Sequence, residues 1–267
     1  MGLDVADGLL TCPVCPGTLA RRDRTVVCPQ QHSFDIARSG YVNLLRGPQP
    51  ANADTGTMLA ARARVHDAGL FAGVTRALSA AIGEASLLLE VGAGTAAHLA
   101  AALADRPNAR GGVAIDVSTA AARLAAKASP RVAAVVADVW RGLPLVGGRV
   151  DAVLCAFAPR NLTEFARVLR PGGRLVVALP TTDHLRELRG RFQLLGVEPE
   201  KRERLLAETA DWFAELGTAR VTSTVAASAA LLADLIAMGP NAFHRPVAVV
   251  DDGPVTADVD VVALVRT

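Results

Sequence analysis

A short glycine-containing segment, residues 87–95 (Leu-Leu-Leu-Glu-Val-Gly-Ala-Gly-Thr), constrains the fold of this chain more than any other feature. Its apolar first half is typical of a strand that is buried on both faces of a parallel sheet. Gly92 and Gly94 then allow a tight turn in which a ligand can approach the backbone, and the helix that follows offers free N–H groups at its start. The segment therefore predicts the ligand-binding turn of a doubly wound α/β fold.

Apolar runs and helical patterns alternate along most of the chain. After a strand at 87–91 we expect strands at 112–115, 132–137, 150–157 and 174–179, with helices between them at 95–104, 119–128 and 162–169. Residues 58–82 look helical, with a break at Gly69. Further on we expect a charged helical region at 185–214, a strand at 221–227, a helix at 228–237 and a last, antiparallel strand at 258–266 that closes the sheet at its edge. Such alternation indicates a parallel, doubly wound sheet.

Two enzyme classes use a Gly-x-Gly turn of this kind. A dinucleotide-dependent dehydrogenase needs a third small residue, and Ala97 completes its Gly-x-Gly-x-x-Ala pattern. A methyltransferase has an acidic residue two positions before the first glycine, where Glu90 stands. This carboxylate can hold the methionine end of S-adenosylmethionine, directly or through water, whereas the anionic pyrophosphate of a dinucleotide has no use for it. Glu90 therefore favours the methyltransferase.

Two further carboxylates follow the next two expected strands. Asp116 can accept hydrogen bonds from both ribose hydroxyls, and Asp138 can accept from the adenine amino group. Ligands of such sheets bind at the carboxyl ends of the strands, where both residues stand. The alternatives are that Asp116 caps the next helix and that Asp138 is a turn residue. With a Leu-Arg-Pro-Gly-Gly turn at 169–173, the pattern predicts a class I (Rossmann-like) methyltransferase domain with S-adenosylmethionine as donor.

A second signal stands near the N-terminus. Cys12 and Cys15 form a Cys-x-x-Cys pair, and Cys28 and His32 follow after twelve residues. Four such sulfur and nitrogen ligands fit a tetrahedral, structural Zn²⁺ with no open coordination position. The alternatives are buried cysteines beside an unrelated histidine, or a disulfide. The remaining cysteine, Cys155, falls on an expected strand and is interpreted as a core residue.

These signals divide the chain into a zinc-binding module at 1–45, a linker and helical segment at 46–82 and a methyltransferase domain at 83–267. The formal net charge of +2 argues neither for nor against a nucleic-acid partner. Two local groups of cations are candidates for phosphate contacts or are solvated faces: Arg21, Arg22 and Arg24, and Arg186, Arg189 and Arg191. Neither a signal peptide nor an apolar run long enough for a bilayer is visible, so we expect a cytoplasmic protein without membrane contact.

Residues 12–45, which end in Gln-His-Ser-Phe-Asp-Ile-Ala-Arg-Ser-Gly-Tyr-Val-Asn-Leu-Leu, resemble the N-terminal module of the 23S rRNA (guanine-N1)-methyltransferases of the RlmA/TlrB type. The similarity continues through 63–71 (Ala-Arg-Val-His-Asp-Ala-Gly-Leu-Phe), the glycine turn, 156–161 (Ala-Phe-Ala-Pro-Arg-Asn), the Pro-Gly-Gly turn and 184–188, and it ends near 238–240. The module with its tail is specific to this family, whereas the glycine turn is generic.

The resemblance implies methyl transfer to N1 of a guanine in hairpin 35 of 23S rRNA. One branch of the family protects the ribosomes of macrolide producers against tylosin- or mycinamicin-like drugs. By position, donor contacts fall on Phe71, His98, Leu99 and His184, although the family can have tyrosine where Phe71 and His98 stand. The resemblance also implies a homodimer that forms a cleft around the RNA.

Arg160 and Asn161 follow the expected strand at 150–157 and are the candidates for catalysis. Asn161 can read the guanine edge, and Arg160 can stabilise the developing oxyanion at O6 or hold a phosphate. The alternative is that both shape a helix start, and no general base stands out. Other functions stay open: methylation of another RNA or of a small molecule, or zinc-dependent RNA binding without turnover.

Overall fold

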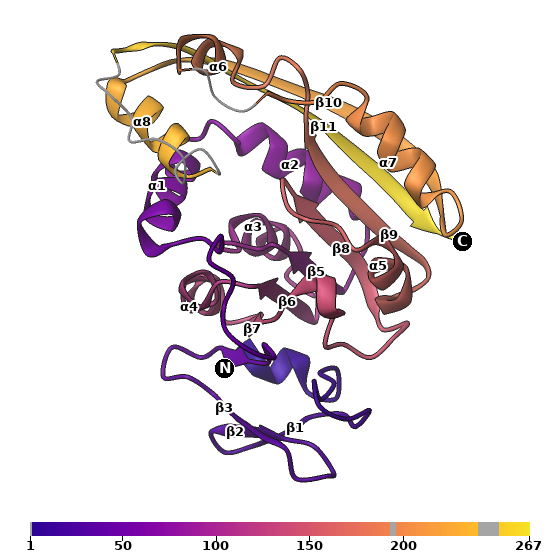
Figure 1. The fold of residues 1–267 in the computed structure, drawn as a ribbon. Helices are drawn as coiled ribbons and strands as arrows, with labels where there is room; N and C mark the ends of the chain where they lie inside the picture. The colour runs from indigo at the N-terminus through magenta and orange to yellow at the C-terminus, as the bar shows by residue number, and fades with distance from the viewer. Residues whose placement is uncertain (1, 193–195, 240–250) are drawn as a thin grey trace.

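The computed structural model describes residues 2–192, 196–239 and 251–267, and a single eight-stranded sheet runs through its centre (Figure 1). The strand order is β10-β11-β9-β8-β5-β6-β7-β4. Its strands are β4 (Val42–Asn43), β5 (Leu87–Val91), β6 (Gly111–Asp116), β7 (Val132–Val136), β8 (Val150–Ala156), β9 (Leu169–Pro180), β10 (Phe213–Ala227) and β11 (Gly253–Arg266). β4 to β9 pair in parallel, and β11 is antiparallel to both of its neighbours.

The apolar runs of the sequence place core side chains on both faces of this sheet. Along β5, Leu87 and Leu89 belong to one apolar cluster and Leu88 belongs to the other. The helices are α1 (Gly56–Asp67), α2 (Ala72–Ala81), α3 (Ala97–Ala104), α4 (Thr119–Ala128), α5 (Leu162–Val168), α6 (Arg186–Phe192), α7 (Lys201–Thr209) and α8 (Ala229–Ala237). Since β5 leads to β6 on one side and β8 lies on its other side, the strand order reverses at the carboxyl end of β5, where ligands of such sheets bind.

Several helices begin where the sequence supplies a capping side chain. The Ser118 hydroxyl accepts a hydrogen bond from the Ala121 N–H at the start of α4, and Thr55 and Ser228 do the same for α1 and α8. The break that Gly69 predicts separates α1 from α2. α1 then packs beside α8, far away in the sequence, and it also contacts α4 (Figure 1). In the described part of the chain, no helix has the length and apolar composition needed to cross a bilayer.

The C-terminal region differs from the prediction in two respects. The last strand does not close the sheet at its edge: β11 lies between β9 and β10, and β10 forms the edge. The burial of β11 fits this interior position, because residues 255–259 are buried in succession and therefore on both faces of the sheet. The region predicted as helical at 185–214 contains α6 and α7 but ends in the first residues of β10; residues 193–195, like Pro240, lie outside the described part.

The N-terminal module forms a small sheet of β1 (Ala20–Arg22), β2 (Thr25–Val27) and β3 (Ser33–Asp35), all antiparallel. After β3 the chain returns to the large sheet as β4, where Val42 pairs with Val135 of β7. Leu19 and Val26 of the module share one apolar cluster with the large sheet, and the short helix η1 (Gly2–Ala6) packs on β6 and β7. The module is therefore joined to the sheet by strand pairing as well as by packing.

Candidate active site and metal centre

Four ligand side chains converge at the outer end of the N-terminal module. Cys12 Sγ lies 3.6 Å from His32 Nδ1, and Cys28 Sγ lies 3.4 Å from the same nitrogen. Cys15 Sγ lies 3.6 Å from Cys28 Sγ, and all four ligand atoms lie within 4.8 Å of one another. Two sulfurs bound to one tetrahedral Zn²⁺ at about 2.3 Å are roughly 3.8 Å apart, so the donor set fits this ion.

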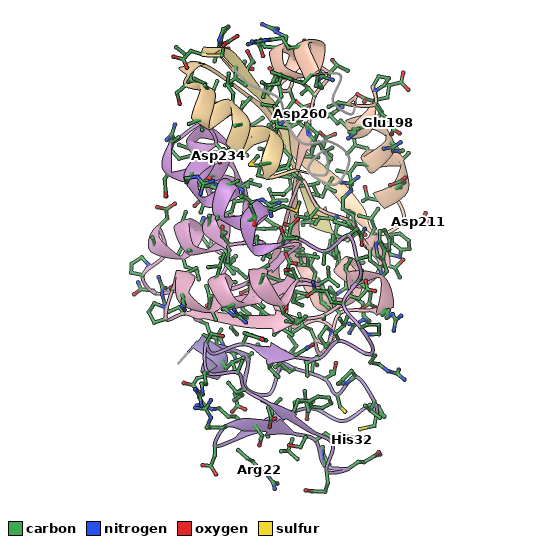
Figure 2. All side chains as sticks on the ribbon, turned by 60° about the vertical axis from the view of Figure 1, so that its left-hand side comes forward. Arg22, His32, Glu198, Asp211, Asp234 and Asp260 are labelled. Atoms are coloured by element: carbon green, nitrogen blue, oxygen red, sulfur yellow. The ribbon has the colours of Figure 1, made fainter. Side chains whose placement is uncertain are left out.

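The backbone of the module supports a closed, structural site. The Val14 N–H donates to Cys12 Sγ at 3.4 Å, as expected for the turn of a Cys-x-x-Cys pair. The Cys12 N–H donates to the Gly17 carbonyl, and the Cys28 N–H donates to the His32 carbonyl, which fixes both ligand turns. Figure 2 shows His32 and Arg22 at this end of the molecule, far from Asp260 on β11. The set of four ligands and the fixed turns therefore fit a structural zinc.

The glycine turn between β5 and α3 is close to two other segments. A Cβ on Gly92 would lie 2.3 Å from the Ala158 Cβ, so only glycine allows the loop after β8 to approach the turn. A Cβ on Gly94 would lie 2.8 Å from Arg62 Nη1. Both glycines also have positive φ angles, +65° and +53°. The turn is therefore packed closely between the loop after β8 and α1.

Glu90 stands near the end of β5, just before this turn, and is fully buried. Its Oε2 accepts a hydrogen bond from the Leu99 N–H at 3.1 Å, which ties the end of β5 to the first turn of α3. Burial raises the pKa of Glu90 to about 8, and the charge of Asp116 acts in the same direction. Leu99 is also buried, and its side chain lies against Gly112 of β6.

The other two carboxylates lie at the ends of β6 and β7. Asp116 accepts from the Gly94 N–H through one oxygen and from the Ser118 N–H through the other, both at 2.8 Å. Each oxygen keeps a second lone pair, so the carboxylate can still accept two ribose hydroxyls. Asp138 accepts from the Trp140 N–H at 3.0 Å and caps the short helix η2 (Val139–Arg141). This is the turn role that the sequence left open for Asp138.

Five rings from five segments gather beside the glycine turn. His66 lies on α1, Phe71 directly before α2 and His98 on α3. Phe157 lies in the loop after β8, and His184 lies in the loop before α6. The Phe157 centroid lies 5.7 Å from those of Phe71 and His184, and the His66 and His98 centroids are 5.0 Å apart.

The two buried histidines of this cluster are neutral at pH 7. His98 Nδ1 lies 2.9 Å from the Thr75 hydroxyl, and burial lowers the pKa of His98 to about 3. His184 Nδ1 accepts from the Asp258 N–H at 3.3 Å, and burial lowers the pKa of His184 to about 4. Neutral rings suit a cationic ligand such as a sulfonium, because they attract it without charge repulsion.

Arg160 and Asn161 have different surroundings. Asn161 caps α5: its Oδ1 accepts from the Glu164 N–H at 3.3 Å and its Nδ2 donates to the Val139 carbonyl at 2.9 Å. This is the helix-start role that the sequence left open. Arg160 is half-buried, and its positive charge acts on Cys155 and on Lys201. Cys155 is a buried core thiol, as predicted, and burial raises its pKa to about 12.

Sequence reasoning missed Arg62, which lies over the glycine turn. Its Nη1 contacts Asp54 Oδ2 at 2.5 Å, and its Nη2 donates to the Met238 carbonyl at 2.8 Å. It also missed His66 and Phe157, although both lie in segments that carry the family resemblance. These residues reach the site through helix packing and a loop, for which a local motif gives no signal.

Sheet order, glycine turn and strand-end carboxylates define a class I S-adenosylmethionine-dependent methyltransferase, and the Cys/His cluster adds an N-terminal zinc ribbon. The family model "RlmA, N-terminal" matches residues 10–49, and the model "Methyltransferase domain" matches residues 88–173. A solved methyltransferase chain in complex with the Haloferax volcanii activator Trm112 has the same fold, with a TM-score of 0.54 and 17% identity over 79% of this chain and 97% of that one.

Two relatives identify the family within this class. The 23S rRNA (guanine(748)-N(1))-methyltransferase of Streptomyces fradiae is 42% identical over 88% of this chain and 86% of its own length. A Micromonospora griseorubida protein named as a 23S rRNA (guanine-N(1)-)-methyltransferase is 41% identical over 88% of this chain and 87% of its own. The chain belongs to the family of 23S rRNA (guanine-N1)-methyltransferases, as its sequence motifs predict.

Proposed function

We propose that this protein transfers a methyl group from S-adenosylmethionine to N1 of a guanine in hairpin 35 of 23S rRNA. The observation that carries the proposal is the family's zinc ribbon in the same chain as a class I methyltransferase sheet, to which β4 at the end of the ribbon is paired. The two relatives support the substrate, since both are named for methylation of a 23S rRNA guanine at N1. Resistance to tylosin- or mycinamicin-type macrolides, action in the cytoplasm and a homodimer around the RNA belong to the same proposal.

The positions described above support the following assignment of the donor contacts. Asp116 holds the ribose hydroxyls, Asp138 faces the adenine end, and Glu90 lies below the methionine end. Phe71, His98, Leu99 and His184 form the wall around the donor. The bound donor supplies an electrophilic methyl group on its sulfonium, so the protein mainly has to orient the guanine N1 in line with it.

Methylation at N1 also requires that N1 loses its proton. Arg160 lies after β8, at the same edge of the sheet as the glycine turn, and its guanidinium can stabilise negative charge on O6 as the proton leaves. Asn161 would have to give up its contacts with α5 to read the base, so its part is to hold the start of that helix. Arg160 is therefore the stronger catalytic candidate of the two.

The zinc ribbon is the proposed RNA-recognition module. Arg22 and Arg24 are exposed on it, whereas Arg21 forms an ion pair with Asp4. The second basic group is Arg186, Arg189 and Arg191. Arg186 Nη1 lies 3.7 Å from Asp183 Oδ1, and Arg191 Nη2 lies 3.7 Å from Asp251 Oδ2, so these carboxylates reduce the positive charge there. Phosphate contacts would therefore come mainly from the module, and they position the RNA without reading its bases.

The test is methylation of a transcribed hairpin 35 RNA by the purified protein, with mass spectrometry of the digested nucleosides. We expect 1-methylguanosine, and none from a hairpin whose loop guanines are replaced. RNA binding without methylation would support the alternative of an RNA-binding protein without turnover. In filter binding, Arg22→Ala with Arg24→Ala should weaken RNA binding and reduce its salt dependence. Arg186→Ala is the matched control, and an equal effect there would move the RNA contact away from the zinc ribbon.

A further inference from the structure

Phe157 combines exposure with an unfavourable backbone conformation. It is 43% exposed, although Phe71 and His184, the rings beside it, are buried. Its φ angle is +56°, a region that bulky side chains rarely adopt and that is often kept at functional sites. The Phe157 N–H donates to the Ala178 carbonyl at 3.2 Å, and the next residue, Ala158, fills the space beside Gly92. Neighbouring segments therefore hold the ring at the mouth of the site.

The ring extends the donor wall outward. On the side that faces the protein, the centroid of the Phe157 ring lies 5.7 Å from that of Phe71 and 5.7 Å from that of His184. The planes of the Phe157 and His184 rings are inclined by 28°. The remaining surface of the Phe157 ring is open to solvent. An aromatic ring held in this way offers a flat, apolar surface to a planar partner.

One cation lies close to this ring along the chain. Arg160 follows Phe157 by three residues in the loop after β8 and is half-buried. A nucleotide has the features that suit an exposed ring with a guanidinium in the same loop: a planar base and an anionic phosphate.

We propose that Phe157 is the stacking platform for the unpaired target guanine. The inference rests on the proposed function, because it requires a nucleotide as substrate. The base must leave its stack to reach the donor, and a ring that replaces the lost stacking stabilises the unstacked state. Phe157 then acts on the RNA, whereas Phe71 and His184 contact the donor.

The experiment uses hairpin RNA with 2-aminopurine at the target position, whose fluorescence reports stacking of that base, together with kinetics on the unmodified hairpin. Phe157→Leu and Phe157→Gly should lower kcat/KM for RNA by about 5- to 100-fold, the range expected for one lost stacking contact, and should leave the Kd of S-adenosylmethionine unchanged. Glycine accepts the positive φ, so the loss in Phe157→Gly cannot come from backbone strain. Phe157→Trp should retain activity and quench the 2-aminopurine emission.

The chain offers a control. Leu216 is another exposed apolar side chain, 50% exposed on the edge strand β10, and Leu216→Ala should behave like the wild type.

The outcomes separate the two proposals. A wild-type protein that forms no 1-methylguanosine on the hairpin contradicts the proposed function. A wild type that methylates it while Phe157→Gly does so equally well overturns the platform alone. Equal losses of donor and RNA affinity in Phe157→Leu would also overturn it, because the ring would then belong to the donor wall.

Discussion

Replacing Glu90 with glutamine tests how the buried carboxyl below the glycine turn affects the stability of the donor-free protein. Burial raises the pKa of Glu90 to about 8, against an ordinary value of 4.5. Between pH 4.5 and about 8, the Glu90 carboxyl has therefore lost its proton in the unfolded chain but keeps it in the folded protein. The stability that the neutral carboxyl contributes is therefore fully present below pH 4.5 and is lost as the pH rises through about 8.

The size of the effect follows from the same values. A difference of one pKa unit corresponds to about 1.4 kcal/mol, so the loss between pH 4.5 and about 8 is on the order of 5 kcal/mol. Glutamine has no proton to lose, and its carbonyl can still accept from the Leu99 N–H. As the pH rises from 4.5 to about 8, the variant should therefore gain stability relative to the wild type by about 1.4 kcal/mol per pH unit, and it should gain little more above about 8.

The assay is urea unfolding of both donor-free proteins from about pH 6 to about pH 9. Glu84, an exposed glutamate in the loop before β5, provides the control, and Glu84→Gln should follow the pH profile of the wild type. If the free energies of unfolding of wild type and Glu90→Gln run parallel over this range, the carboxyl is ionised in the folded protein and the reasoning from burial is wrong.

Three further predictions concern the donor and the metal. Asp116→Ala should weaken S-adenosylmethionine binding, since each lost hydrogen bond to a charged acceptor contributes about 1.5–3 kcal/mol at most; unchanged affinity in calorimetry would refute the ribose assignment. Arg62→Ala should weaken S-adenosylmethionine binding about 10- to 100-fold, because it removes a cation that can pair with the donor carboxylate. Arg64→Ala breaks the ion pair with Asp234 and should lower only the Tm. An equal loss of donor affinity in both would instead indicate a displaced helix. Cys15→Ser should remove the one zinc found by elemental analysis and unfold residues 12–45 in hydrogen exchange, with donor binding retained; a folded wild-type module without zinc contradicts this.

Much of the main domain could be predicted, because the features that set it are local. Strand 87–91 agrees with β5 to the residue, and helix 119–128 agrees with α4, since apolar runs, glycines and the Ser118 cap act within a few positions. Parallel pairing then brings the ends of β5, β6 and β7 to one edge of the sheet. The convergence of Glu90, Asp116 and Asp138 at that edge therefore follows from sequence alone.

The remaining features depend on contacts between distant segments. The interior position of β11 depends on the partner that β10 provides, and a strand pattern does not specify its neighbour. Arg62 comes to the glycine turn because α1 packs on α8, and it bonds to Met238, 176 residues away. Phe157 has an ordinary place in a loop sequence, and only the folded backbone gives it a positive φ and an exposed ring.

The pairing of β4 with β7 has a consequence for how a target is selected. Val42 and Asn43 belong to the chain of the zinc ribbon, yet their backbones are hydrogen-bonded into the sheet that carries the donor pocket. A loose tether would let a recognition module deliver many nucleotides to the pocket, whereas a shared sheet fixes the span between them. An RNA held by the ribbon would then present only the nucleotide at that span, so the enzyme would act as a molecular ruler. A hairpin with one base pair added between the stem that the ribbon binds and the target guanine should bind as tightly as the unchanged hairpin but should be methylated poorly.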